Sequence, residues 1–503
     1  MYSATVAIDF GTTYSGFAYV INDAHPGDQY INIRQWKDEY GQNHYKTPTC
    51  LLLGKSGRSF DSFGFDAQEK YIRFEDGKDK QYYMFENFKM ALHTDGAHGI
   101  HKDSELTALN DKKLKTLEVL KFALKYMAEQ SLAKIRSETG RQISFKNIKW
   151  VITVPAIWKP SSKQLMREAA KQAGMLPRGD DQLVIALEPQ AASIHCKKCK
   201  SSDFHVPSNR KDELQVQSEG TSYLVLDCGG GTIDMTVHRI TSINTIEELY
   251  KASGGPWGGT KVDEKFEDLM KEIFGKDAIR AFKKQYPAAW YTIKRRFQHV
   301  KTTDYARKGD LTMVDLNEYE FSQCFNHSVV QKSLEANPKF KDDIKYKKGM
   351  LRIGSSVMKE LFSPSISNIA KLITDLLKQL KRKDIKIDFI FFVGGFSECK
   401  LLQEEIKKKF GDDHCILFPF DAKLCVLKGA ISFGRQSNII QKRVSPMTFG
   451  TDICPKFDAN KHEERRKYRD SEGTLRCDGV FKKLISVDEE ITIGGLRNSV
   501  SLP

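Results

Sequence analysis

The sequence predicts an α/β protein in which two similar lobes face each other across a cleft. Three observations lead to this prediction. A chain of 503 residues is too long for a single hydrophobic core. Strand and helix patterns alternate along it and follow a similar order in both halves. A buried strand that ends at an aspartate and runs into a glycine-rich turn occurs once in each half, at 5–13 and at 223–232.

The turn in the second half lies within SYLVLDCGGGTIDMTV, residues 222–237. An apolar run ends at Asp227, and the glycines at 229–231 that follow are more than a tight hairpin needs. The exposed N–H groups of such a turn can cradle an anion. Since Asp227 and Asp234 on either side would repel an anion, the pattern indicates a cation between them, for which Mg²⁺ is the usual ion. We therefore predict a phosphate site.

The N-terminal residues repeat this design. The strand at 5–8 ends at Asp9, the turn Gly-Thr-Thr lies at 11–13, and a second strand returns at 17–20. Two such turns in two similar lobes can hold one phosphate chain between them. The pair of turns is therefore a more specific indication of phosphate binding than either turn alone.

The other elements divide the chain into four predicted parts. These are a first lobe at 1–195, a polar exposed insertion at 196–221, a second lobe at 222–437 and a β-rich tail at 438–503. In the first lobe we expect strands within 1–53, a helix at 114–135, a strand at 148–154, a helix at 163–173 capped by Ser161 and Ser162, a strand at 184–186 and a helix from 191. In the second lobe we expect hairpin strands within 222–250, helices within 261–301 and 355–382, a strand at 387–393, a helix at 399–409, a strand at 416–419 and a helix at 424–434.

Composition and charge limit which binding partners and which cellular compartment we expect for the chain. The formal net charge is +14, but Lys and Arg are dispersed among acids, as on solvated helix faces, so no nucleic-acid partner is expected. The longest apolar run, 385–396, is shorter than the ~20 residues of a membrane helix, so no membrane segment is expected. Ten cysteines without the framework of a small disulfide-bonded domain, and no visible signal peptide, indicate the cytoplasm or the nucleus.

Five segments resemble, in the same order along the chain, those of the actin, hexokinase and heat-shock 70 kDa ATPase superfamily. They are two phosphate segments at 8–16 and 224–234, two connecting segments at 187–195 (LEPQAASIH) and 426–434 (VLKGAISFG), and an adenosine segment at 391–403 (FFVGGFSECKLLQ). Within this superfamily, VITVPAIWKPSSKQLMREAAKQAG at 151–174 is similar to the heat-shock 70 kDa chaperone family. SGGPWGGTKVDEKF at 253–266 and ISVDEEITIGG at 485–495 resemble its divergent twelfth branch.

The resemblance implies an actin-like ATPase fold with duplicated ribonuclease-H-like lobes, and ATP or ADP and Mg²⁺ as cofactors. It implies that Asp9 and Asp227 hold Mg²⁺ through water molecules. The catalytic residues that it implies are Lys89, Glu188, Thr232 and Asp234. The nucleotide-binding residues that it implies are Gly11, Thr12, Thr13, Tyr14, Gly229, Gly230, Gly231, Lys301, Gly394, Gly395 and Phe396. Such chemistry depends on positioning and charge stabilisation of the phosphates.

The sequence departs from the family on the base-binding side. Phe396 and Glu398 stand where a serine and an adenine-stacking arginine are usual, and Gln298 stands where a ribose-binding glutamate is expected. Lys423 replaces a usual aspartate. The resemblance therefore implies an intact phosphate half and an altered adenine pocket.

These features together favour a slowly hydrolysing ATP switch of the heat-shock 70 kDa type, with protein clients or a signalling partner. A non-hydrolysing nucleotide- or phosphate-binding adaptor is the alternative, and a sugar kinase is less favoured because no kinase signature is visible. The tail is short for a substrate domain and is interpreted as a reduced remnant of one. Cys196 and Cys199, with His195 and His205, could bind zinc, but a single Cys-x-x-Cys favours a loop of reduced thiols.

Overall fold

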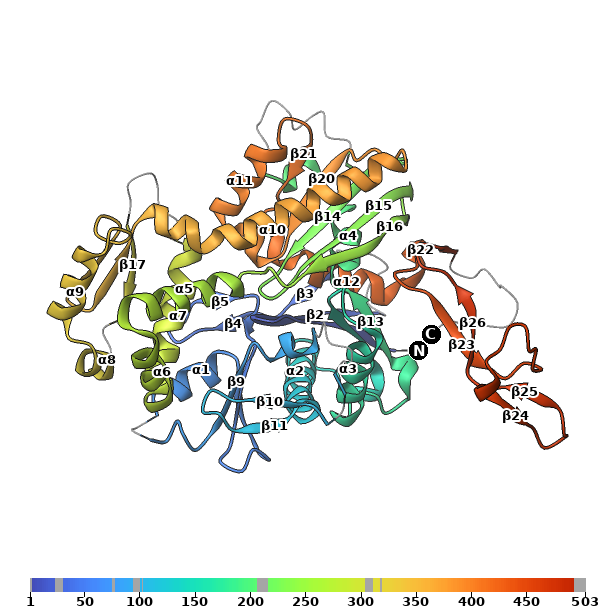
Figure 1. Cartoon of the computed structure of the whole chain (residues 1–503), viewed down its shortest axis with the longest axis horizontal. Coiled ribbons are helices and arrows are strands. Elements are labelled where there is room, and N and C mark those ends of the chain that lie inside the picture. Colours follow the sequence, from blue (N-terminus) through green and yellow to red (C-terminus); the bar gives the residue numbers. More distant parts are fainter. Residues whose placement is uncertain are drawn as a thin grey trace.

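The protein has a mixed α/β structure in which most helices pack against two large β-sheets (Figure 1). The computed structural model describes residues 2–22, 30–74, 77–93, 100–101, 103–205, 216–303, 311–316 and 319–492. Residues 206–215 of the predicted insertion and 493–503 of the predicted tail lie outside this range. Within the described residues, no helix combines the length and the apolar character that a membrane span requires.

The first large sheet is built around the N-terminal hairpin. Its strand order is β13-β12-β1-β2-β3, with β6 paired to β2. The strands are β1 (Ala4–Phe10), β2 (Tyr14–Ile21), β3 (Asn32–Ile33), β6 (Thr47–Pro48), β12 (Ile148–Val154) and β13 (Leu183–Leu187). β1 is antiparallel to β2 and parallel to β12. All of β1 is buried, as expected for a central strand covered on both faces.

Helices cover both faces of this sheet. On one face, Val6 and Ile8 of β1 belong to an apolar core shared with α2 (Thr116–Thr139) and α3 (Pro160–Gln172). On the other face, Ala7 belongs to a core shared with α4 (Glu188–Cys196) and α12 (Cys425–Arg435). This alternation follows from the two-residue period of a strand. It leaves the end of β1, where Asp9 lies, at the edge between the two cores.

A smaller unit lies beside the first sheet. Its strands run in the order β8-β7-β9, next to the helix α1. Its elements are β7 (Cys50–Leu53), β8 (Phe60–Phe63), α1 (Phe65–Ile72), β9 (Tyr83–Glu86) and the 3₁₀ helix η2 (Phe88–Leu92). Two short ladders accompany it, formed by β4 (Trp36–Lys37) with β5 (Asn43–His44) and by β10 (Glu105–Thr107) with β11 (Lys113–Lys115).

The second large sheet has the strand order β21-β20-β14-β15-β16-β22-β27. Its strands are β14 (Ser222–Cys228), β15 (Ile233–Ser242), β16 (Thr245–Gly255), β20 (Phe389–Val393), β21 (Cys415–Leu417), β22 (Ile440–Val444) and β27 (Glu490–Thr492). β14 is antiparallel to β15 and parallel to β20. The second glycine-rich turn therefore leaves its sheet in the same setting as the first turn.

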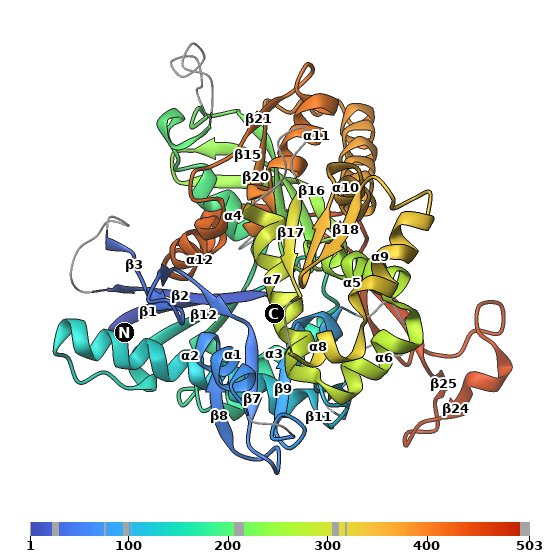
Figure 2. The same ribbon diagram turned by 90° about the vertical axis from the view of Figure 1, so that its left-hand side faces the viewer.

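Helices and a small sheet complete the second half (Figure 2). The helices are α5 (Thr260–Phe274), α6 (Lys276–Gln285), α7 (Pro287–Thr303), α8 (Tyr319–Cys324), α9 (His327–Ala336), α10 (Ser355–Arg382) and α11 (Lys400–Phe410). The small sheet has the order β17-β19-β18 and consists of β17 (Thr312–Asp315), β18 (Ile344–Lys347) and β19 (Met350–Ile353). This sheet could not be predicted from the sequence, because its strands are only four residues long.

The helices α4 and α12 connect the two large sheets. Their apolar side chains share one core with Val151 of the first sheet and with Val225 and Phe391 of the second. The helices also approach closely, because a Cβ on Gly429 of α12 would overlap the carbonyl group of Ala191 in α4. Only glycine permits this contact. The two halves are thus joined by a packed helix pair rather than by a linker.

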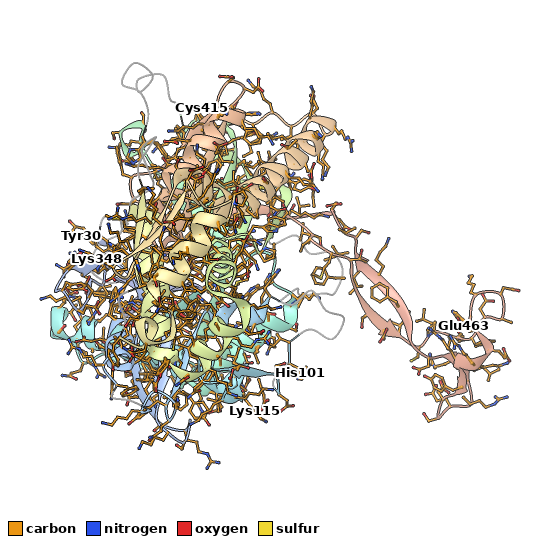
Figure 3. All side chains as sticks on the ribbon, turned by 60° about the vertical axis from the view of Figure 1, so that its left-hand side comes forward. Tyr30, His101, Lys115, Lys348, Cys415 and Glu463 are labelled. Carbon is orange, nitrogen blue, oxygen red and sulfur yellow. The ribbon has the colours of Figure 1, made fainter. Side chains whose placement is uncertain are left out.

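The chain after residue 437 consists mainly of strands and turns. β22 extends the second sheet by pairing with β16 in parallel orientation. Two ribbons, β23 (Phe449–Ile453) with β26 (Val480–Ile485) and β24 (Lys467–Arg469) with β25 (Leu475–Cys477), project from the body of the protein. Figure 3 shows Glu463 far out on this projection. Most side chains of β23 and β26 are exposed or half-buried.

Two local predictions were wrong. Helix α3 begins at Pro160 with Lys159 as its N-cap, and Ser162 does not cap it, because its buried hydroxyl donates to the Leu92 carbonyl at 2.6 Å. Helix α4 begins at Glu188 instead of Ala191. In both helices a proline lies in the first turn, where its missing N–H group is not needed.

Candidate functional site

The two glycine-rich turns meet between the halves of the protein. A Cβ on Gly230 would overlap the Thr13 side chain, and a Cβ on Gly231 would overlap the Thr12 side chain. Glycine is therefore required at both positions. Tyr14, which begins β2 next to these threonines, is 49% exposed. The predicted phosphate-binding residues of both turns thus form one contiguous group.

The start of α5 determines how the second turn is oriented. The amides of Gly258, Gly259 and Thr260 donate to the carbonyls of residues 231, 229 and 230, at 3.1, 3.2 and 2.8 Å. Because the peptide group is planar and trans, the N–H that follows each carbonyl points the opposite way. Within the described part of the chain, the amides of residues 230 and 231 have no protein acceptor. They are free to bind an anion.

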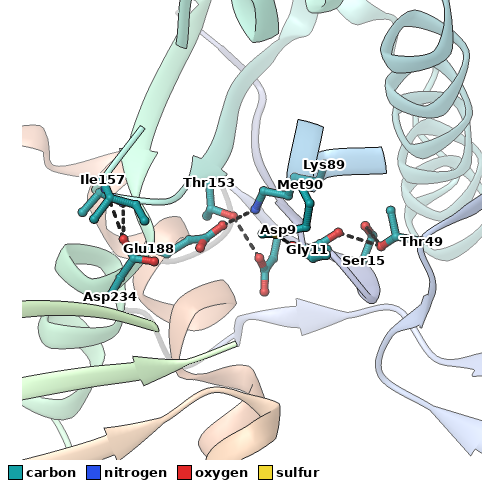
Figure 4. Close-up of polar contacts among 12 residues, drawn as sticks. Asp9, Gly11, Ser15, Thr49, Lys89, Met90, Thr153, Ile157, Glu188 and Asp234 are labelled. Carbon is teal, nitrogen blue, oxygen red and sulfur yellow. Dashed lines mark hydrogen bonds and ion pairs between the residues drawn. The ribbon is translucent and has the colours of Figure 1, made fainter. Parts of the chain in front are cut away.

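Asp9 is held by two side chains that approach its two carboxylate oxygens. The Thr153 hydroxyl donates to Oδ1 at 2.9 Å (Figure 4), and the Lys46 ammonium lies 2.5 Å from Oδ2. Neither contact could be predicted from the sequence, because Lys46 lies in no recognisable motif and the family-like segment at 151–174, which contains Thr153, does not indicate a contact with Asp9. Burial acts to lower the pKa of Lys46, but the carboxylates of Asp9, Asp227 and Glu188 outweigh it and raise this pKa.

Lys89 and Glu188 form a buried ion pair next to Asp9 (Figure 4). Lys89 lies on η2, Glu188 is the first residue of α4, and their Nζ and Oε1 atoms are 2.5 Å apart. Only 2% of Lys89 is exposed. Burial raises the pKa of Glu188 to about 7, and the Lys89 charge opposes this shift. A carboxylate with such a pKa can exchange a proton with water near neutral pH.

The second half contributes Asp227, Asp234 and Thr232. Asp227 is the next-to-last residue of β14 and lies next to Gly394, which has a φ of 85° and where a Cβ would overlap the Asp227 carboxylate. Asp234 Oδ1 accepts hydrogen bonds from the amides of Ala156 and Ile157 at 2.7 and 3.2 Å (Figure 4). Burial raises the pKa of both aspartates, and the Thr232 hydroxyl opposes the shift at Asp234.

The charges at this site fit a divalent cation. Asp9, Glu188, Asp227 and Asp234 are each less than 10% exposed. The ammonium groups of Lys46 and Lys89 form ion pairs with Asp9 and Glu188, and the Lys163 charge also acts on Asp234. When the four carboxylates, Lys46 and Lys89 are all ionised, two negative charges remain among these six groups. Within the described residues, no three carboxylates, histidines or cysteines converge as direct metal ligands. Mg²⁺ commonly keeps several of its waters, so these carboxylates would hold it through water molecules.

The predicted base-binding residues lie next to the second turn, but most of their polar and aromatic groups already contact other protein side chains. Lys301 donates to the Gly259 carbonyl at 2.9 Å and forms an ion pair with Asp263, which also accepts a hydrogen bond from Gln298. Phe396 is only 5% exposed, and its ring stacks on a core phenylalanine. Little of this ring is left for contact with a base. Its predicted role, like the other predicted roles, stays a prediction.

Two departures from the family pattern contact each other. The carboxylate of Glu398 lies 3.8 Å from the ammonium of Lys423, and both side chains are at least 41% exposed. Glu398 stands where the family usually has an arginine, and Lys423 where it usually has an aspartate, so both positions carry the opposite charge. An exposed pair of this kind contributes at most ~1 kcal/mol. Gly395, beside Glu398, is exposed, and no atom lies within 4 Å of the position of a Cβ on it.

On another side of the site, α7 contacts α1 and the loop that follows α1 (Figures 1 and 2). Gln68 donates to the Tyr291 hydroxyl at 2.8 Å, and the ring of Tyr71 meets that of Tyr291 edge-on at 5.9 Å. Asp79 accepts a hydrogen bond from the amide of Ala288 at 3.4 Å. We call these residues the α1–α7 contact. Tyr291 is only 2% exposed, so this contact between the first half and α7 is buried.

The cysteines near the insertion do not form a metal site within the described residues. The Cys196 thiol is buried and shares a hydrogen bond with Cys425 of α12. Cys199 donates to the His195 carbonyl at 3.5 Å, and the His205 ring contacts an aromatic ring 4.2 Å away.

Comparison with known proteins identifies similar chains. A family model described as Hsp70 protein matches residues 88–464. Heat shock 70 kDa protein 12A of Mus musculus is 38% identical over 537 residues, which cover 98% of this chain and 78% of that protein. Heat shock 70 kDa protein 12B of Homo sapiens is 34% identical over 542 residues, or 98% and 77% of the two chains. The chaperone protein dnaK of Cyanidium caldarium is 25% identical over 335 residues, or 66% and 47%.

Proposed function

The chain belongs to the Hsp70 family, and from this premise we propose that it is a Mg²⁺-dependent ATP switch that hydrolyses ATP slowly. One observation carries the proposal. Two glycine-rich turns and four buried carboxylates from both halves converge on one site, although they are far apart in sequence. The similar strand arrangement around β1 and β14 supports duplicated lobes of the actin-like type.

In the proposed reaction, the residues of this chain position the phosphates and a water molecule. The amides of Gly230 and Gly231 and the hydroxyls of Thr12 and Thr13 would bind phosphate oxygens. When bound, Mg²⁺ would neutralise part of the phosphate charge. Glu188 would orient the attacking water, since its pKa lies near neutral pH. Such positioning and charge stabilisation account for most of the catalysis in phosphoryl transfer.

The remaining candidate residues would assist this reaction. Lys89, held against Glu188, would contribute positive charge beside the transferring phosphate. Asp234 and the Thr232 hydroxyl, which contact each other, would lie near the attacking water. These roles are what the family resemblance implies for the present positions.

The contacts between the halves support the switch. The α4–α12 pair would act as a hinge, and the α1–α7 contact would break when nucleotide enters or leaves. Because the site carboxylates are buried, nucleotide exchange would require this opening. A protein client or signalling partner would detect the difference between the two states. Ten free cysteines are consistent with the proposed cytoplasmic or nuclear location.

The first test measures phosphate release from Mg-ATP together with calorimetric titration of Mg-ATP and Mg-ADP. We expect turnover well below the ~1–10³ s⁻¹ of metabolic enzymes. Asp9→Asn and Thr232→Ala should abolish the release while preserving the fold. Turnover above ~1 s⁻¹ would contradict the switch.

An adaptor that binds nucleotide without hydrolysis is the second candidate. The buried Phe396 ring and the exchanged Glu398–Lys423 pair favour it, because both alter the base-binding side. Tight binding without phosphate release would decide for the adaptor. Transfer of phosphate to a sugar or polyol would decide for a kinase.

A further inference from the structure

Lys46 occupies a position that the proposed reaction does not yet use. Its ammonium lies 2.5 Å from Asp9 Oδ2, and the carboxylates of Asp227 and Glu188 are close enough to act on its charge. Its side chain is 17% exposed, more than the 6% of Asp9. Lys46 is therefore a cation among the carboxylates that are proposed to face Mg²⁺ and the phosphates.

The chain holds Lys46 in this place firmly. The residues after it form β6, which pairs with β2 of the first phosphate hairpin. The Thr49 amide donates to the Thr13 carbonyl, and the Thr49 hydroxyl to the Gly11 carbonyl, both at 2.8 Å. A Cβ on Gly16 would lie 3.0 Å from Lys46 Cγ, so the side chain runs along the hairpin. Lys46 thus moves with the first turn as one unit.

The charge balance of the site explains why a cation at position 46 matters for phosphate binding. When the four carboxylates and both lysines are ionised, two negative charges are left among these six groups, and without Lys46 three would be left. A phosphate chain between the two turns must approach this negative field. A lysine in such a field attracts a phosphate strongly, because the effective dielectric is far below that of water. Mg²⁺ also supplies positive charge there, but only while it is bound, whereas the Lys46 charge is always present.

We propose that Lys46 is a phosphate-binding residue that carries part of the charge neutralisation otherwise left to Mg²⁺. The ammonium holds Asp9 in the empty site and contacts the β-phosphate or γ-phosphate when a nucleotide is bound. Nucleotide then stays bound when Mg²⁺ is scarce. This inference rests on the proposed function, since it requires that a nucleoside phosphate binds between the two turns.

The test measures ADP affinity by calorimetry with Mg²⁺ and with EDTA, in the full chain. The wild type and Lys46→Met are compared through the ratio of the two dissociation constants. Lys46→Arg keeps the charge and should restore the wild-type ratio. Lys37→Met, at an exposed position of the same lobe, is the matched control.

We expect EDTA to weaken ADP binding about tenfold in the wild type and about a hundredfold or more in Lys46→Met, the scale of one unit charge at contact distance. With Mg²⁺, Lys46→Met should lose less ADP affinity than it loses in EDTA, because the metal then supplies part of the missing positive charge, and a circular dichroism spectrum like that of the wild type would show that the variant is folded. Inorganic pyrophosphate should give the same ranking, because the effect acts on phosphate and not on the base.

Three results would overturn the inference. Equal ratios in the wild type and Lys46→Met would reduce Lys46 to a structural counter-ion of Asp9. Tighter Mg-ADP binding in Lys46→Met would show that the lysine competes with the metal. In both cases the wild type still binds ADP, so the proposed function survives. Absence of ADP binding by the wild type with Mg²⁺ would overturn the proposed function as well.

Discussion

The α1–α7 contact predicts that a single hydroxyl group controls nucleotide release. In Tyr291→Phe the ring remains, and the hydroxyl that accepts from the Gln68 amide and hydrogen-bonds Cys50 is lost. Both side chains are buried, so the amide is left without a partner in the closed arrangement. Leaving such a group unpaired costs about 1–3 kcal/mol. In the open arrangement water can pair with the amide, so the cost falls on the closed state alone.

This cost can be converted into a rate. Since ~1.4 kcal/mol corresponds to a tenfold change, Tyr291→Phe should shift the equilibrium toward the open state by about 5-fold to 150-fold. Release of nucleotide should accelerate by a similar factor if opening precedes it. Tyr291→Ala also removes the edge-on contact with Tyr71, which adds about 0.5–1.5 kcal/mol, and should release nucleotide faster still.

The assay is stopped-flow release of a fluorescent ADP analogue into excess unlabelled ATP. Tyr250→Phe is the matched control, because the Tyr250 hydroxyl also hydrogen-bonds a glutamine, donating to Gln379 Oε1, but within the second half alone. Its loss should lower stability without changing release. Equal release rates in Tyr291→Phe, Tyr250→Phe and the wild type would refute the reasoning that the α1–α7 contact closes the site.

Three further predictions follow from the buried charges and thiols. The pKa of Glu188 is raised from 4.5 to about 7, so its contribution to stability is complete below pH 4.5 and is lost as the pH rises through 7. In EDTA, Glu188→Gln should reduce the slope of the melting temperature against pH between pH 4.5 and 7, and an unchanged slope would contradict the raised pKa of Glu188. Lys89→Met leaves the Glu188 charge buried alone and should cost about 3–5 kcal/mol in denaturant unfolding. The double variant with Glu188→Gln should recover part of this loss, and no recovery would show that the two side chains act independently. A thiol reagent should label the exposed Cys324 and Cys454 before the buried cysteines. Mass spectrometry of the labelled peptides gives the order of labelling, and early labelling of a buried cysteine would contradict this prediction.

Local patterns account for the parts of the site that could be predicted. Asp9 and Asp227 could be recognised because a buried strand, an aspartate and a glycine-rich turn follow each other within a few residues. Family membership, inferred from five ordered segments, is confirmed by the Hsp70 match and by relatives at 34–38% identity. Lys89 was placed from a weak motif, and it lies against Glu188. Its catalytic role stays a prediction.

Other features could not be predicted, because they depend on distant segments. Lys46 and Thr153 both contact Asp9, yet they lie 37 and 144 residues from it. Asp263, which holds Lys301, and Tyr291, which closes the α1–α7 contact, were also missed. Thr153 and Asp263 lie in segments that resemble the family, but neither segment indicates which distant side chain they contact, and Lys46 and Tyr291 belong to no such segment.

The sequence by itself determined the mixed α/β class, the two glycine-rich turns and the family. Each of these rests on local periodicity, on the conformations that glycine permits, or on residues close together in the chain. Only the tertiary structure decided which charges meet. The pairing of Glu398 with Lys423, and the position of Lys46 among the carboxylates, depend on contacts between separate elements. Electrostatic energy depends on distance in space, and the order of residues along the chain does not specify that distance.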